Sequence, residues 1–596
     1  MKLRLIRRSA GGHPAGPQRE ADRLLYRAVR RAPGWTCALA LATLTAAGAG
    51  LALPAAAAAA VDAALRGTAL GPAAVLLAAL LLLATLADML AVAAGPAATA
   101  AVTAELRRLL IRHVLAVGPQ AERSFAAGDL NSRLVGATAR TAAAAPALVG
   151  AATAAATSLG GVAALWLIDW RLAAAFVLAA APALAVMRTF VARSSELSLA
   201  YQRHVGSLAA RLSDALHGIR TIRAAGTGDR EIERVLAPLP ALAASGRALW
   251  HAQSGAVWRM GLLLPLVEVA VLATAGHGVA AGRVTPGQLL AAAAYTALGT
   301  ALFNQADSLM GLAQARAGAR RIAEVLALAA PPAGTQPLAA GPGELAFRNV
   351  TVRAGARTVL DRLDLTVPPG SLLAVVGRSG AGRSTLALLA ARLLDPDEGE
   401  VLLDGQPLTD VADSALRAGV ACAFARPGLL GATVAEAIAY GLPDAGPDAD
   451  LARIRSAARA AELEAFVDRL PGRYGTPLAD TPMSGGEAQR LGLARAIARD
   501  ARLLVLDDAM SSLDSATAAR VETVLTEGLA GRTRVLVTHR AATAARADLV
   551  VWLEDGRIRA TGRHDLLWDD PDYRAVFGGR TPAQAPEKEE SCPVAG

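Results

Sequence analysis

The chain has 596 residues, of which 54% are hydrophobic and only 19% are charged, and its net charge is +9. Soluble domains carry about a quarter charged residues, so this composition argues against a purely soluble protein and excludes a disordered or fibrous chain. The basic residues are not interleaved with aromatic ones, so no nucleic-acid partner is expected. The three cysteines, Cys37, Cys422 and Cys592, stand far apart in the sequence and form neither a disulfide framework nor a zinc-binding spacing.

Long apolar stretches fill the first half of the chain. Residues 1–33 are polar and basic, and we expect them to form a cytoplasmic N-terminal segment. A bilayer span needs roughly 20 apolar residues. The candidate spans are about 35–60, 71–95, 144–167, 172–191, 256–276 and 286–307.

Arginine placement gives the orientation of these spans. Arginine-rich segments precede the first span and separate the second from the third and the fourth from the fifth, which places those segments in the cytoplasm. The sequence therefore predicts an all-α transmembrane domain of six helices over residues 34–329, surrounded by membrane lipid in the cell membrane. The two cytoplasmic connections are long, and Ala104–Val117 and Leu208–Arg223 within them show helical periodicity.

Two carboxylates are expected at bilayer depth. Asp88 lies in the second span and Glu268 in the fifth. Such groups are costly in lipid and face a cavity or a partner. They either line a path for cationic substrate groups or bond one helix to another, and both interpretations stay open.

Beyond the spans the composition changes to that of an α/β domain. Residues 330–343 are rich in Pro and Gly and are expected to be a linker, and residues 580–596 a disordered tail. Between them, residues 344–579 alternate short aliphatic runs with helical patterns, which predicts a nucleotide-binding domain. The expected strands are Leu372–Val376, Val401–Leu403, Leu503–Leu506, Arg534–Val537 and Val550–Trp552.

A glycine-rich segment follows the first of these strands. Glycines let successive backbone N–H groups point at one phosphate, and a helix beginning at Ser384 adds the positive end of its dipole. Alone, the segment is also compatible with a glycine turn that binds no ligand. The residues assigned to nucleotide binding here are Gly377, Arg378, Ser379, Gly380, Ala381, Gly382, Arg383, Ser384 and Thr385.

Further motifs follow in order: Met483-Ser484-Gly485-Gly486-Glu487-Ala488-Gln489-Arg490, then a strand ending in Asp507-Asp508, then Ser511–Asp514 and Val537–His539. With the glycine-rich segment they resemble the ABC transporters. Over about residues 20–575 the chain is similar to a half-transporter of the exporter type, which fuses a six-helix membrane domain to one P-loop ABC ATPase domain. Ala127–Leu134 and Gly218–Ala224 resemble its two coupling-helix regions.

The resemblance implies ATP and Mg²⁺ as cofactors. Asp507 ends a buried strand, so its carboxylate can hold Mg²⁺ beside the Ser384 hydroxyl. Asp508 occupies the place of a glutamate that polarises the attacking water, and His539 would lie near the γ-phosphate.

The signature Ser484, Gly485 and Gly486, followed by Glu487, opens a helix whose N-terminus can bind a γ-phosphate. In the family that phosphate belongs to ATP held by a second subunit. Two chains would therefore enclose two nucleotides, and each site would contain residues of both.

Four departures from the family pattern fall in this chain's own site. Arg383 replaces a lysine, Asp508 replaces the glutamate, Ala354 stands where an adenine-stacking aromatic is expected, and Ala425 stands in place of a metal-sensing glutamine. Losing one positioned transition-state contact costs on the order of 10²–10³ in rate. We therefore expect this site to bind ATP but hydrolyse it slowly, so that hydrolysis depends on a second, different half-transporter whose site the intact signature completes.

The exported substrate stays open among a peptide, a secondary metabolite, a drug-like compound and a lipid. A lipid flippase or a thiol-compound exporter would carry the same motifs. The alternative function is an ATP-sensing regulatory subunit that gates its partner. A soluble ABC ATPase of nucleic-acid repair is a third possibility, which a requirement for detergent in extraction would exclude.

Overall fold

The computed structural model describes residues 22–27, 30, 33–67, 71–355, 357–442 and 450–578. The expected tail over 580–596 and most of the expected N-terminal segment lie outside these residues. The chain forms two compact units, and the break between them falls between Ala329 and Ala330.

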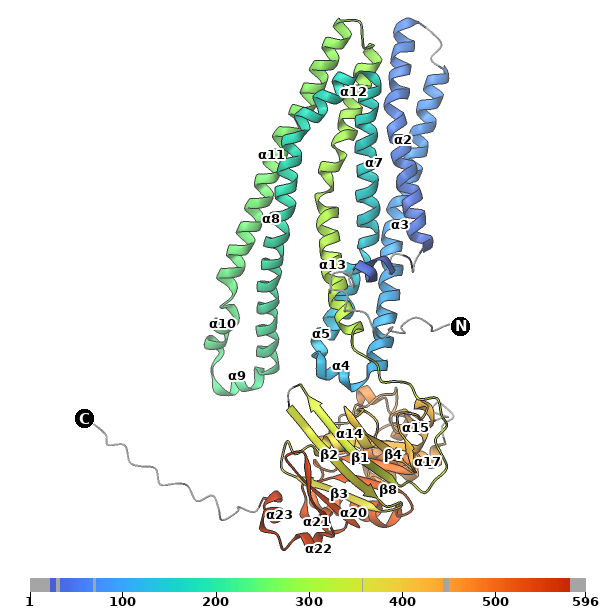
Figure 1. Cartoon of the computed structure of the whole chain (residues 1–596), viewed down its shortest axis with the longest axis vertical. Helices are drawn as coiled ribbons and strands as arrows, with labels where there is room; N and C mark the ends of the chain where they lie inside the picture. Colours follow the sequence, from blue (N-terminus) through green and yellow to red (C-terminus); the bar gives the residue numbers. More distant parts are fainter. Residues whose placement is uncertain are drawn as a thin grey trace, which may run out of the picture. The chain divides into compact units, whose positions relative to one another are not determined.

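Long helices make up the first unit (Figure 1). They are α2 (Pro33–Arg66), α3 (Gly71–Val117), α7 (Ala144–Ile168), α8 (Trp170–His217), α11 (Leu239–Ala280), α12 (Pro286–Gly299) and α13 (Ala306–Leu326). Between α3 and α7 the chain forms α4 (Pro119–Ser124), α5 (Ala127–Ser132), the π-helix η1 (Arg133–Ala137) and α6 (Thr138–Ala142). The helices α8 and α11 run side by side and are joined at one end by α9 (Ile219–Ala225) and α10 (Gly228–Leu236).

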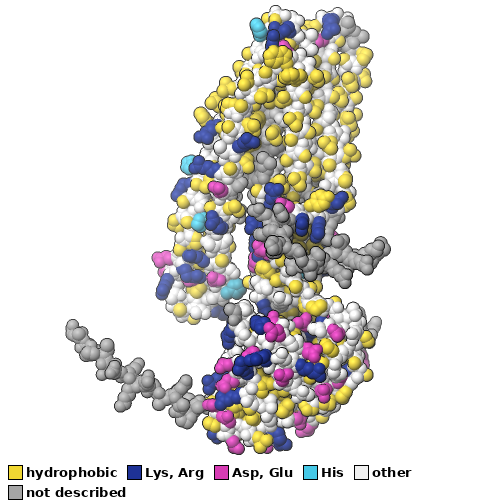
Figure 2. All heavy atoms as spheres, in the orientation of Figure 1, with side chains coloured by type: hydrophobic (Ala, Val, Ile, Leu, Met, Phe, Trp, Pro, Cys, Tyr) yellow, Lys and Arg dark blue, Asp and Glu magenta, His cyan; other side chains and the backbone are white. Residues whose placement is uncertain are grey.

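Five helical stretches within the described residues are long and apolar enough to cross a membrane. They are Pro33–Arg66, Gly71–Val117, Ala127–Ile168, Trp170–His217 and Gly228–Ala280. These stretches contain the first five expected spans. Hydrophobic side chains cover much of their visible face (Figure 2). Exposed aliphatic residues on these helices include Leu82, Val92 and Leu178.

The sixth expected span is not one continuous helix. After α12 the chain passes through the 3₁₀-helix η2 (Thr300–Gln305) before α13 begins. The Ser158 hydroxyl donates to the carbonyl of Gly299, and a Cβ at Gly161 would lie only 2.8 Å from the Tyr295 carbonyl oxygen. This close approach of α7 accompanies the change of helix type at Thr300.

The predicted helical connections are present. Ala104–Val117 continues α3, whereas Leu208–Arg223 is divided at Gly218 between α8 and α9. In the first connection the Arg133 guanidinium donates to Asp129 at 2.7 Å and to Glu324 at 2.6 Å, and Arg321 donates to Asp129 at 2.6 Å. These bonds join α13 to Ala127–Leu134, the first segment that resembles a coupling helix.

The second unit contains two sheets. Among the described residues, the antiparallel sheet has the order β2-β1-β4-β5 and comprises β1 (Leu345–Ala354), β2 (Arg357–Val367), β4 (Glu398–Leu403) and β5 (Gln406–Pro407). The larger sheet has the order β10-β9-β3-β8-β7-β6 and comprises β3 (Leu372–Gly377), β6 (Val420–Phe424), β7 (Leu503–Asp507), β8 (Thr533–Val537), β9 (Leu549–Glu554) and β10 (Arg557–Gly562). Only β10 is antiparallel to its neighbour there. All five strands expected from the sequence are present.

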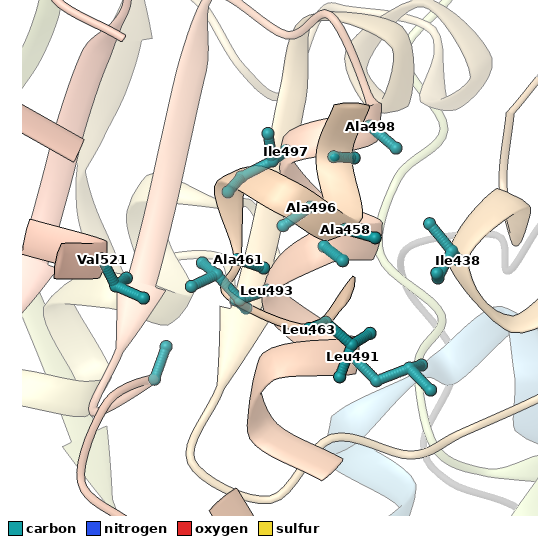
Figure 3. Packing of buried hydrophobic residues seen from close by; sticks show 14 of the residues in the cluster. Ile438, Ala458, Ala461, Leu463, Leu491, Leu493, Ala496, Ile497, Ala498 and Val521 are labelled. Atoms are coloured by element: carbon teal, nitrogen blue, oxygen red, sulfur yellow. The ribbon is translucent and has the colours of Figure 1, made fainter. Parts of the chain in front are cut away.

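Ten α-helices accompany the two sheets among the described residues of this unit. They are α14 (Arg383–Ala390), α15 (Asp413–Gly419), α16 (Val434–Ala439), α17 (Leu451–Ala460), α18 (Glu464–Val467), α19 (Gly485–Ala498), α20 (Ser515–Thr523), α21 (Ala541–Ala545), α22 (His564–Leu567) and α23 (Pro571–Val576). Figure 3 shows how α19 packs through small and aliphatic side chains such as Leu491, Leu493 and Ile497. Because Leu491 and Leu493 are fully buried, α19 has little freedom to move apart from its neighbours.

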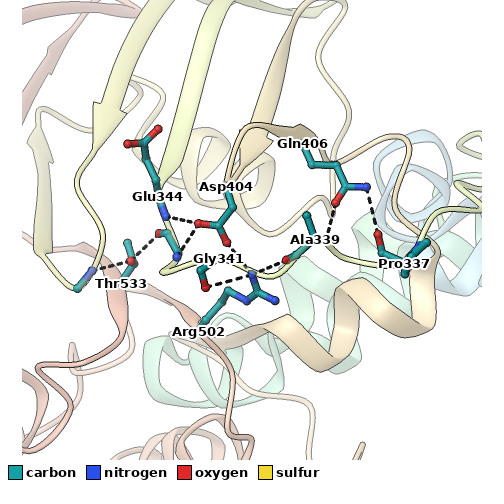
Figure 4. Close-up of polar contacts among 10 residues, drawn as sticks. Pro337, Ala339, Gly341, Glu344, Asp404, Gln406, Arg502 and Thr533 are labelled. Atoms are coloured by element: carbon teal, nitrogen blue, oxygen red, sulfur yellow. Dashed lines mark hydrogen bonds and ion pairs between the residues drawn. The ribbon is translucent and has the colours of Figure 1, made fainter.

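The segment expected to be a linker is bonded to the α/β unit along its second half (Figure 4). The buried Asp404 carboxylate accepts from the backbone N–H groups of Gly343 at 2.7 Å and Glu344 at 2.9 Å. Arg502 donates to Asp404 at 2.6 Å and to the Ala339 carbonyl at 2.7 Å. Residues 339–344 are therefore an ordered part of this unit.

Candidate functional site

The glycine-rich loop lies at the carboxyl end of β3, in the middle of the larger sheet. Two of its glycines are required by geometry. Gly377 has φ +153° and a Cβ there would lie 2.3 Å from the Leu553 carbonyl oxygen, and Gly382 has φ +99° with Leu360 Cδ2 at 2.6 Å. The helix α14 begins directly after Gly382, and no side chain caps its N-terminus. Its first backbone N–H groups are thus available to a phosphate, and the loop fits a nucleotide.

Ser384 and Asp507 meet as predicted. The Ser384 hydroxyl donates to Asp507 Oδ1 at 3.0 Å. Burial raises the pKa of the Asp507 carboxyl, with the hydrogen bond from Ser384 opposing it and the neighbouring Asp508 adding to it. A hydroxyl beside a carboxylate is a pair of hard oxygen donors, so these residues fit Mg²⁺.

Asp508 and His539 come from neighbouring strands. β7 and β8 are parallel and Asp507 is paired with Val537, so the residues that follow each strand lie at one edge. The distance from His539 Nδ1 to Asp508 Oδ1 is 3.5 Å. Asp508 has φ +49°, a left-handed conformation that Asp tolerates better than most residues.

Arg383 is the first residue of α14, and its side chain reaches the end of β8. Its NH1 is 3.4 Å from the carbonyl oxygen of Thr538, the residue that follows β8. The Arg383 guanidinium differs from the ammonium group of a lysine at this position, because it is planar, its charge is delocalised and its donors have a fixed geometry.

The signature segment is well formed. The Ser484 hydroxyl accepts from the Glu487 N–H at 3.2 Å while the Glu487 carboxylate accepts from the Ser484 N–H at 2.8 Å, a capping box at the start of α19. Partial burial raises the pKa of Glu487, but the hydrogen bonds from Ser484 and the nearby arginines outweigh it and the pKa lies below its ordinary value. Among the described residues, no hydrogen bond or ion pair joins this segment to the glycine-rich loop.

The two alanine departures lie at or directly after the ends of strands. Ala354 is the last residue of β1, and Ala425 follows β6 directly. Near Ala354, the Arg357 guanidinium approaches the loop, with NH2 at 3.9 Å from where a Cβ of Gly380 would lie. The sequence reasoning did not assign Arg357. The sequence signal that could have pointed to Arg357 is its position, three residues beyond Ala354.

Comparison with known proteins agrees with this arrangement. Residues 36–302 match the ABC transporter transmembrane region, and residues 360–511 match the ABC transporter family. The chain is 46% identical over 487 residues to ABC transporter ATP-binding protein RamA of Streptomyces coelicolor, a match that covers 80% of this chain and 74% of that protein.

Further relatives are more distant. Identity to an ATP-dependent lipid A-core flippase of Pseudomonas aeruginosa is 32% over 431 residues, covering 71% of this chain and 70% of the flippase. A multidrug efflux ATP-binding/permease protein of Mycobacterium bovis is 34% identical over 63% of this chain, which spans only 32% of that protein. The solved structure of a bacterial Atm1-family ABC exporter with ATP bound matches with a TM-score of 0.75 and 26% identity, covering 91% of this chain and 98% of that one.

These matches cover both units, and the ABC family of the second unit implies that it binds ATP. The apolar helices make the chain a multi-pass membrane protein with a cytoplasmic ATPase domain. The chain belongs to the ABC transporter family and is an ATP-driven half-transporter of the exporter type, with one transmembrane domain fused to one ATPase domain.

Proposed function

We propose that this chain is the slowly hydrolysing half of a heterodimeric exporter. The observation that carries the proposal is an asymmetry between two parts of the ATPase unit. Arg383, Asp508, Ala354 and Ala425 all depart from the family pattern in the chain's own nucleotide site, whereas the signature segment retains its Ser-Gly-Gly sequence and a complete capping box.

The chain's own site retains what is needed to hold ATP. The uncapped N-terminus of α14 and the glycine-rich loop would hold the phosphates, and Ser384 with Asp507 would hold Mg²⁺, which neutralises charge on the phosphate oxygens when bound. The site has lost groups that act on the transferred phosphoryl. Asp508 is shorter than glutamate by one methylene, so its carboxylate orients a water less well, and the Ala425 side chain has no oxygen to contact metal or water.

The combined loss is large even though such effects are not additive. One missing transition-state contact lowers the rate by about 10²–10³. The signature residues Ser484, Gly485 and Gly486 of this chain would instead complete the site of a partner that supplies a lysine and a glutamate.

Asp88 and Glu268 support the need for a partner in the membrane. Both carboxylate side chains are exposed on the single chain. Intramembrane charges face a bundle interior or a water-filled cavity rather than lipid. A second membrane domain would give both groups such surroundings.

The substrate proposal is an amphipathic small molecule, peptide or lipid. The matched relatives include proteins named for lipid A-core flipping and for multidrug efflux. Within the described residues, the helical stretches long enough to cross a membrane are apolar and contain segments with few charges, which is compatible with such a cargo.

Co-purification tests the proposal directly. The chain is expressed alone and together with the half-transporter encoded beside it, and ATPase activity is measured in lipid nanodiscs. The pair is expected to hydrolyse ATP, while this chain alone binds it with little turnover. Robust hydrolysis by the chain alone that Asp508→Ala abolishes would overturn the proposal.

A further inference from the structure

Gln489 is a buried polar side chain on α19, five residues beyond Ser484, and it is only 2% exposed. Its Nε2 donates to the Ala425 carbonyl at 2.8 Å and to the Ser511 hydroxyl at 2.9 Å. Its Oε1 accepts from the Ser512 backbone N–H at 2.8 Å. One amide group thus joins α19 to the segment after β6 and to the loop after β7.

The same three segments also approach each other closely on either side of Gln489. A Cβ at Gly486 would lie 3.0 Å from the Ser512 carbonyl oxygen, and a Cβ at Gly492 would lie 2.6 Å from Pro427. Gln489 therefore stands between two tight contacts. Both amide hydrogens and the amide oxygen are used, so an apolar replacement would leave buried polar groups without partners.

We propose that Gln489 is a positioning residue that keeps the signature segment Ser484–Gly486 in register with the segment after β6 and the loop after β7. Gln489 donates to the main-chain carbonyl of Ala425, so this hydrogen bond does not require a polar side chain at position 425. α19 thereby stays connected to the segment after β6 even though the glutamine expected there is absent. The inference rests on the proposed function, in which the signature of this chain completes a partner's site.

A purely structural role for Gln489 makes a different prediction. Loss of a buried core contact would lower the melting temperature and the amount of active complex, but not the turnover of the complexes that remain folded. A positioning role lowers kcat at the composite site with little change in KM for ATP, because small misplacements remote from the chemistry slow the reaction.

The first measurement is hydrogen exchange on the full-length complex. In Gln489→Leu the Ser512 amide is expected to exchange at least tenfold faster, and the segment after β6 is expected to lose protection too. The matched control is Arg495→Leu, which removes another bond from α19, to the Gly428 carbonyl at 2.7 Å, and leaves the loop after β7 untouched. That control should loosen only the segment after β6.

A second variant keeps the test valid if the leucine variant does not fold. Gln489→Glu retains an acceptor for the Ser512 N–H but loses both donors, so Ser512 should stay protected while the segment after β6 exchanges faster.

Kinetics of the co-purified pair complete the test. Gln489→Leu and Gln489→Glu are expected to lower kcat by about tenfold or more with KM for ATP within twofold, whereas Arg495→Leu retains most of kcat. Unchanged exchange at Ser512 in Gln489→Leu, or a kcat loss no larger than that of the Arg495 control, would overturn the inference. If the wild-type pair shows no turnover, the proposed function fails, and hydrogen exchange still decides whether Gln489 joins the loops.

Discussion

Replacing Ser484 with alanine separates two roles of one hydroxyl group. The hydroxyl caps α19 by accepting from the Glu487 N–H at 3.2 Å, and it donates to the Glu487 carboxylate at 2.8 Å. The alanine variant keeps the bond from its own N–H to that carboxylate and the ion pair of Glu487 with Arg469 at 3.3 Å. Loss of an N-cap hydroxyl costs about 1 kcal/mol, which for a domain of this size lowers the melting temperature by about 2–4 °C.

The effect on turnover is expected to be much larger. If Ser484 donates to the γ-phosphate of the partner's ATP, its removal lowers kcat of the pair by about 10²–10³. That loss corresponds to about 3–4 kcal/mol of transition-state stabilisation, several times the effect on stability. Steady-state ATPase assays and thermal melting of the same preparation measure the two effects independently.

Thr433→Ala is the matched control. Thr433 caps α16 through the same hydroxyl contact, since its hydroxyl accepts from the Glu436 N–H at 3.2 Å; here the Glu436 carboxylate accepts from the preceding Ala432 N–H at 2.8 Å. It should lose similar stability and keep turnover within about twofold. Equal turnover in the two variants would refute the reasoning and favour the ATP-sensing regulatory subunit.

The triple variant Arg383→Lys, Asp508→Glu, Ala425→Gln should raise hydrolysis at the chain's own site at least tenfold in the pair, where each single change does little, because the lost contacts act together. Lowering the pH through the raised pKa of Asp507 should weaken nucleotide binding in the presence of Mg²⁺ more than in its absence, because only the ionised carboxylate holds the metal; equal pH profiles in fluorescent-ATP titrations would contradict this. Asp404→Ala should lower the melting temperature by about 4–8 °C, because it removes the carboxylate that accepts from the partly buried Arg502 and from two backbone N–H groups and so costs about 2–3 kcal/mol.

The sequence predicted the parts of the site that depend on local pattern. An aliphatic strand followed by glycines at fixed spacing predicted the loop after β3, and an aliphatic strand ending in Asp507 predicted a carboxylate beside the Ser384 hydroxyl. The Ser384–Asp507 contact of 3.0 Å follows from the order β3-β8-β7, because these three parallel strands bring their carboxyl ends to one edge of the sheet. The first five spans were predictable for a similar reason, since length and hydropathy alone define them.

What the sequence did not predict depends on contacts between distant segments. The change to a 3₁₀-helix after α12 accompanies the close packing of Gly161 against Tyr295, which no local pattern reveals. Gln489 was part of the signature motif but had no role assigned to it, and only the fold brings it to Ala425 and Ser512. The sequence also did not predict the hydrogen bonds of residues 339–344. A Pro- and Gly-rich stretch has the composition of a linker, and composition does not show that the Asp404 carboxylate binds its backbone.

The bonded linker and the nucleotide site share two strands of the larger sheet. Arg502 immediately precedes β7 and donates to the Ala339 carbonyl, while Thr533 begins β8 and its hydroxyl donates to the Gly343 carbonyl at 2.6 Å. Asp507 and His539 lie at or just beyond the opposite ends of these same strands, roughly 17–20 Å away at a rise of about 3.3 Å per residue. Strands buried on both faces in a parallel sheet are stiff, so a displacement of the linker at one end is not absorbed locally. Residues 339–343, at the start of the ATPase unit, are thus bonded to the two strands at whose opposite ends Asp507, Asp508 and His539 lie, and the linker is part of the framework that supports the proposed nucleotide site.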